Sequence, residues 1–126
     1  MMIRDGLSVR RERKLKALDG HQLFGLFCEG ARNLSAQRAA LDRINVFPVP
    51  DGDTGSNMAN TLNYAVESAR ASDSAALTLN SIAESALAGA RGNSGVIFAQ
   101  FILGFAESMG EEVFLDMERF AKAVSK

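Results

Sequence analysis

The sequence has one cysteine, one histidine, no tryptophan and only two prolines. A lone cysteine cannot form a disulfide within the chain, and Cys28 and His21 together are too few ligands for a structural zinc site. No run approaches the roughly 18 consecutive apolar residues of a membrane span. Basic and acidic residues nearly cancel, 14 against 15, so no overall charge attracts nucleic acid or an anionic membrane. We therefore expect a cytoplasmic domain with no membrane span and no nucleic-acid partner.

What is present is the composition of one globular domain. The 126 residues are 47% hydrophobic and 23% charged, and a chain of this size can bury about two-thirds of its unfolded surface in a single core. Basic residues gather near the N-terminus between Arg4 and Lys16. Such a block is typical of a solvated leader, and a membrane or RNA patch is the alternative. We expect a leader over residues 1–17 and a folded domain over residues 18–126.

Apolar residues recur at helical spacing along most of the domain, whereas alternating period-two stretches are nearly absent. The pattern predicts an all-α fold of antiparallel helices joined by short connections. The expected helices are 20–33 after an Asp19 cap, 35–44, 56–71, one capped by Thr78 that ends near Gly89, 94–109, and a last one capped by Asp116. Helix 94–109 is apolar on most sides and is expected to lie centrally.

Two aspartates lie two residues apart in a proline-stiffened turn. Asp51 and Asp53 flank Gly52, directly after Pro48 and Pro50. A stiff turn can bring two carboxylates to one hard cation with little ordering cost, and Mg²⁺ is typically held by one or two carboxylates with substrate phosphates. The alternative is an aspartate-rich turn that only caps a helix.

A second polar loop, Gly92-Asn93-Ser94-Gly95, opens the apolar helix as Gly55-Ser56-Asn57 opens the one before it. Helix N-termini offer unpaired N–H groups and a positive partial charge, so two of them could hold a triphosphate together. Taken alone, the second loop also fits a simple turn or cap.

Better-known motifs do not match. An EF-hand that starts at Asp51 would place Leu62 where a bidentate glutamate is required. No Walker A lysine follows a glycine run, and the glycines at 89, 92 and 95 do not have the dinucleotide-binding spacing.

The run from Asn45 to Met58, NVFPVPDGDTGSNM, and the run from Gly89 to Phe98, GARGNSGVIF, resemble the DAK2-type ATP-binding domain. This domain is shared by the L subunit of dihydroxyacetone kinase and by the N-terminal part of bacterial fatty acid kinase. The prolines and Thr54 resemble the fatty acid kinase branch. Residues 18–125 carry the resemblance, and the family domain continues further, so the domain is expected to be truncated at its C-terminus.

The resemblance implies an antiparallel α-helical barrel with Mg·ATP or Mg·ADP at one end. It implies that Asn45, Asp51 and Asp53 hold two Mg²⁺ ions, the two aspartates being the catalytic residues. The implied nucleotide-binding residues are Thr54, Gly55, Ser56 and Asn57 in the first loop and Asn93 and Ser94, flanked by Gly92 and Gly95, in the second.

The function implied is ATP-dependent phosphoryl transfer to a substrate on a partner subunit, either a fatty acid or dihydroxyacetone. The alternative is a truncated, non-catalytic module that binds nucleotide or a partner kinase chain. A structural helical bundle is a third possibility. Self-association is also expected, because an incomplete barrel would leave Phe98, Phe101 and Phe105 without cover.

Overall fold

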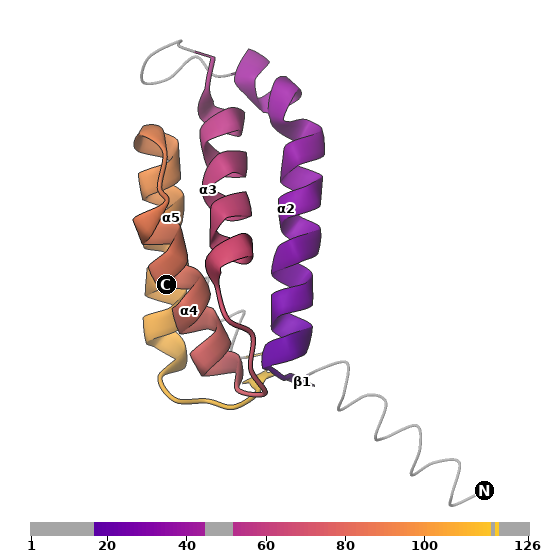
Figure 1. Cartoon of the computed structure of the whole chain (residues 1–126), viewed down its shortest axis with the longest axis vertical. Helices are drawn as coiled ribbons and strands as arrows, with labels where there is room; N and C mark the ends of the chain where they lie inside the picture. The colour runs from indigo at the N-terminus through magenta and orange to yellow at the C-terminus, as the bar shows by residue number, and fades with distance from the viewer. Residues whose placement is uncertain (1–16, 45–51, 117, 119–126) are drawn as a thin grey trace, which may run out of the picture.

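The computed structural model describes residues 17–44, 52–116 and 118. Its helices are α2 (Gly20–Arg43), α3 (Thr54–Ser68), α4 (Ala75–Ala88) and α5 (Gly92–Met109). The four run up and down as antiparallel neighbours (Figure 1). Two short strands, β1 (Ala17–Leu18) and β2 (Leu115–Asp116), pair antiparallel at one end. The all-α prediction is confirmed for the described residues.

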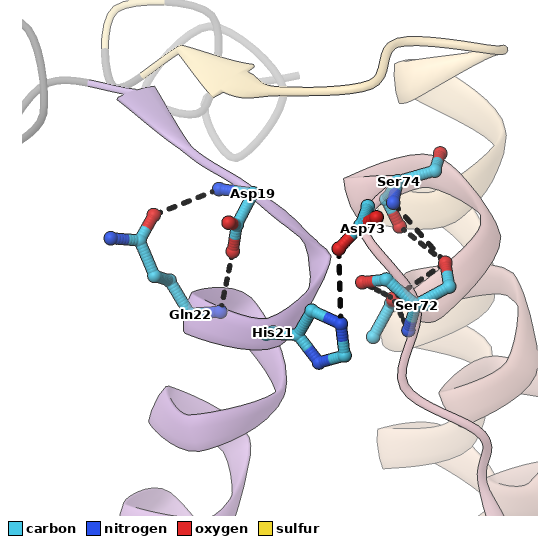
Figure 2. Close-up of polar contacts among 7 residues, drawn as sticks. Asp19, His21, Gln22, Ser72, Asp73 and Ser74 are labelled. Carbon is cyan, nitrogen blue, oxygen red and sulfur yellow. Dashed lines mark hydrogen bonds and ion pairs between the residues drawn. The ribbon is translucent and has the colours of Figure 1, made fainter.

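Helix α2 begins where the sequence predicts but is longer. The Asp19 carboxylate accepts from Gln22 N at 2.8 Å, and Gln22 Oε1 accepts from Asp19 N, which is a complete capping box (Figure 2). The predicted break between 33 and 35 is wrong, because α2 continues to Arg43. Ser35 does not cap a second helix, since its hydroxyl accepts from Asn63 Nδ2 of α3 at 3.0 Å.

Helix α4 begins earlier than predicted. Ser74 is its N-cap and accepts from Leu77 N, so the assignment of Thr78 as the cap is wrong. Thr78 is fully buried in the first turn, where its Oγ1 accepts from Ser72 N at 3.0 Å and donates to Ser72 O at 3.2 Å. Its hydroxyl therefore fixes the connection between α3 and α4 to the first turn of α4.

Small residues let the helices approach closely, and the largest fully buried side chains include Leu79, Ile82 and Ile102. Six of the core alanines show no exposed area: Ala59, Ala65, Ala75, Ala83, Ala86 and Ala99. Helix α3 packs against each of the other three helices.

Contrary to the prediction, helix α5 does not lie at the centre of the bundle. Val96, Ile97 and Phe101 are 47%, 70% and 54% exposed, so α5 covers one side of the bundle. None of the described helices is long and apolar enough to cross a membrane.

An apolar hollow of about 340 Å³ is lined by residues of α2, α3 and α5. Phe98 and Phe105 line it from α5 and are largely covered, whereas Phe101 at its rim is half exposed. Self-association through this face stays a prediction. The expected last helix lies outside the described residues except for its cap, where Asp116 Oδ1 accepts from Glu118 N at 2.8 Å.

Replacement of Asp19 by alanine should lower the free energy of unfolding by about 1 kcal/mol, because the Gln22 N–H in the first turn of α2 loses its acceptor. Asp73→Ala is the matched control. The side chain of Asp73 is 95% exposed, and its carboxylate lies 3.2 Å from the His21 ring (Figure 2), so its loss should cost under about 0.5 kcal/mol. Urea unfolding of both variants checks this, and equal losses would contradict the capping assignment.

Candidate functional site

The two polar loops meet at one end of the bundle. The end of α2 and the start of α3 lie at the same end of the bundle as the end of α4 and the start of α5, opposite the β1–β2 pair (Figure 1). Asn45 and Asp51 lie outside the described residues, so their predicted metal-binding role is not tested. Asp53 is described and is the N-cap residue of α3.

The first turn of α3 is pressed against the last turns of α2. Gly55 is buried there, and a Cβ at this position would clash with the carbonyl oxygen of Arg38 and the side chain of Leu41. Asp53 O accepts from Asn57 N at 2.8 Å, which closes the first helical turn. Only glycine at position 55 allows the helix to start this close to α2.

Asp42, from the last turn of α2, caps α3 from outside. Its carboxylate accepts from Ser56 N at 2.9 Å and from Ser56 Oγ at 2.6 Å. The hydroxyl of Ser56, followed by the backbone N–H groups of Ser56 and Gly55 and the charge of Arg38, lowers the pKa of Asp42 below its ordinary value. Both donors of Ser56 are therefore directed at a protein carboxylate.

Arg38 adds a cation at the same place, with Nη2 donating to Ser56 Oγ at 3.2 Å. Neither Arg38 nor Asp42 was predicted from the sequence. Their four-residue spacing on a helix signals that they share a face, but nothing in the sequence pairs them with Ser56, which is fourteen positions after Asp42 and eighteen after Arg38.

The first turn of α5 is packed onto α3 through two glycines. Gly92 has φ +65°, and a Cβ there would clash with the side-chain amide of Asn57. A Cβ on Gly95 would clash with Thr61 Oγ1. Since both positions exclude a side chain, α5 starts in direct contact with the first two turns of α3.

Thr61 joins the two helix starts by hydrogen bonds. It is fully buried, donates from Oγ1 to Asn57 O at 2.7 Å and accepts from Arg91 N at 3.0 Å. Arg91 is the N-cap residue of α5. No signal in the sequence points to this role, because Thr61 lies in the middle of a helical pattern.

The first turn of α5 supplies the second helix N-terminus of the candidate site. No side chain caps it, and its first turn contains no acidic residue. Asn93 is exposed and Ser94 partly so. The first N–H groups of a helix have no partner within the helix and carry a positive partial charge, so this turn is suited to bind an anionic group such as phosphate.

Sequence-predicted residues from both loops are thus brought together: Asn57 contacts Gly92, and Gly95 lies against the same turn of α3. Thr54 follows Asp53 in the first turn of α3. Within residues 17–44, 52–116 and 118, no three metal-ligating side chains form a cluster. The predicted ligand set includes two residues outside these ranges, so the magnesium prediction stays open.

Comparison with known proteins agrees with this geometry. Residues 48–126 match the family model of the DAK2 domain. Protein YloV of Bacillus subtilis is 36% identical over 112 residues, covering 87% of this chain. An uncharacterized protein of Staphylococcus epidermidis is 36% identical over 115 residues (86% of this chain), and one of Staphylococcus saprophyticus is 38% identical over 109 residues (84%).

The chain belongs to the DAK2 domain family, a kinase-related family whose domains bind ATP. It spans about 20% of the length of each of these three relatives. The family resemblance predicted from the two loops is confirmed.

Gly92→Ala should destabilise the fold by about 1–2 kcal/mol or more, because alanine at positive φ is strained and its Cβ meets Asn57. Gly104→Ala is the matched control within α5. A Cβ at Gly104 meets nothing within 4 Å, so this change should stabilise the helix by about 0.5–1 kcal/mol. Thermal unfolding distinguishes them, and a neutral Gly92→Ala would contradict the close contact between the two loops.

The Asp42–Ser56 contact predicts a pH dependence of stability. The pKa of Asp42 is lower in the folded chain than in the unfolded chain, where it is about 3.9. Its stabilising effect is therefore complete well above that value and is lost as the pH falls through it towards the folded pKa. Asp42→Asn should be less stable than the wild type near neutral pH, and the difference should shrink on acidification. Urea midpoints across this range check it; a constant difference would contradict the assignment.

Proposed function

We propose that this chain binds Mg·ATP or Mg·ADP between the first turns of α3 and α5 and provides the nucleotide-binding part of a phosphoryl-transfer enzyme. The observation that carries the proposal is the contact of Gly92 and Gly95 with Asn57 and Thr61. It brings together the two loops whose sequences match the DAK2 family. The first turn of α5 contains no acidic residue, and the N-cap residue of α3 is Asp53.

The phosphates would be bound by the N–H groups of Gly92, Asn93 and Ser94 in the first turn of α5, with Asn93 and Ser94 adding side-chain donors. Gly95 would flank them, since its own N–H donates to Arg91 O. On the α3 side, the site would be lined by Thr54, Gly55 and Asn57. Ser56 is a weaker candidate, because it would have to release Asp42 to reach a phosphate.

Asn45, Asp51 and Asp53 are the proposed ligands of Mg²⁺, since carboxylate and amide oxygens suit this ion. Magnesium would supply charge neutralisation on the phosphate oxygens during transfer. The residues of this chain would hold and orient the nucleotide, and the bundle would keep the two loops at a fixed separation.

The phosphoryl acceptor would come from another part of a longer protein or from a partner subunit. The single histidine, His21, lies at the opposite end of the bundle next to Asp73, and no described side chain at the nucleotide end is a convincing base. By resemblance, the acceptor is a fatty acid carboxylate or dihydroxyacetone. A leader over residues 1–17 and a cytoplasmic location stay predictions.

A non-catalytic nucleotide-binding module is the second candidate. It is favoured by the same lack of an acceptor-side base among the described residues. Phosphoryl transfer assayed with the rest of the protein or a partner subunit would distinguish the two functions.

Titration of the chain with ADP by calorimetry should show binding that depends on Mg²⁺. Asp53→Ala and Asp51→Ala should weaken it by about tenfold or more, because each removes a ligand charge, while helicity by circular dichroism is retained. Asp73→Ala, at the far end, should bind as the wild type does. Affinity that is unchanged without Mg²⁺ and in both site variants would contradict the proposed metal site.

A further inference from the structure

We infer that Thr61 is a positioning residue for the nucleotide site: its hydroxyl fixes the start of α5 against the start of α3. The inference rests on the proposed function and adds to it a residue that no motif contains. Thr61 is one of two buried polar residues in the described core, with no exposed area.

The hydroxyl uses its donor and its acceptor capacity on different helices. It donates to Asn57 O within α3 and accepts from Arg91 N, thirty residues away at the cap of α5. Asn57 N donates in turn to Asp53 O, and Gly95 N donates to Arg91 O. A continuous series of four hydrogen bonds therefore links Asp53 to Gly95.

This series of hydrogen bonds connects Asp53, a proposed metal ligand, to the first turn of α5, where the phosphate is proposed to bind. The side chain of Arg91 does not cap α5, so the bond from its own backbone N–H to Thr61 anchors the start of the helix. Without the hydroxyl, the Arg91 N–H would lose this acceptor, and the first turn of α5 would sample other positions. When only a fraction of molecules is competent to bind, the apparent dissociation constant rises by the inverse of that fraction.

The protein offers a matched control at the other end of the bundle. Thr78 is also fully buried, and its hydroxyl likewise accepts from a backbone N–H and donates to a carbonyl, both of Ser72. Thr78→Val and Thr61→Val remove the same group from equally buried sites. Both should therefore lower stability, but only Thr61→Val should affect the nucleotide site.

The first measurement is Mg·ADP affinity. Thr61→Val should bind about three- to tenfold more weakly than the wild type, Thr61→Ser should restore most of the affinity, and Thr78→Val should leave it unchanged. Wild-type affinity in Thr61→Val, or an equal loss in Thr78→Val, would overturn the inference. If the wild type itself binds no Mg·ADP, the proposed function fails instead.

Amide hydrogen exchange in the nucleotide-free protein tests the inference without relying on nucleotide binding. The amides of Arg91 and Gly95 should be protected in the wild type and in Thr78→Val, and should exchange faster in Thr61→Val. A wild-type Arg91 amide that exchanges as in an unstructured peptide would overturn the inference without any variant.

Discussion

The direct contact between the first turns of α3 and α5 is the constraint on which the functional end of this domain depends. It requires the absence of side chains at Gly92 and Gly95, because a Cβ at either position would occupy the space of Asn57 or Thr61. Glycine at position 92 also permits the positive φ with which α5 begins. Side chains at these positions would force the helix starts apart.

This contact has an electrostatic consequence. Two helix N-termini at the same end of the bundle bring two positive partial charges close together. The ionised carboxylate of Asp42 compensates the start of α3 through Ser56. No side chain caps α5, and its first turn contains no acidic residue. The N–H groups of that turn are therefore the ones that we propose to bind an external phosphate.

The sequence predicted the features that depend on local chemistry. Helical periodicity indicated the all-α class, the Asp19 cap and the helices around the two glycine loops, and the loop motifs indicated the family. Prediction from the sequence failed for polar side chains that can hydrogen-bond to more than one possible partner. Ser35 and Thr78 are typical cap residues, yet Asn63 and Ser72 respectively bind their hydroxyls, and such pairings leave no periodic signal in the sequence. The roles of Asp42 and Thr61 were missed for the same reason. Helix α5 was predicted to be central because hydropathy does not show which apolar face lacks a neighbour.

The most direct test is a backbone NMR titration of this chain with Mg·ADP. Binding at the paired helix starts should perturb the amides of Asp53 to Asn57 and of Arg91 to Gly95 together, with the same apparent affinity, and leave those around Asp19 and Asp73 unchanged. Perturbation of only one of these two groups, or of the β1–β2 end, would contradict a nucleotide site formed jointly by α3 and α5.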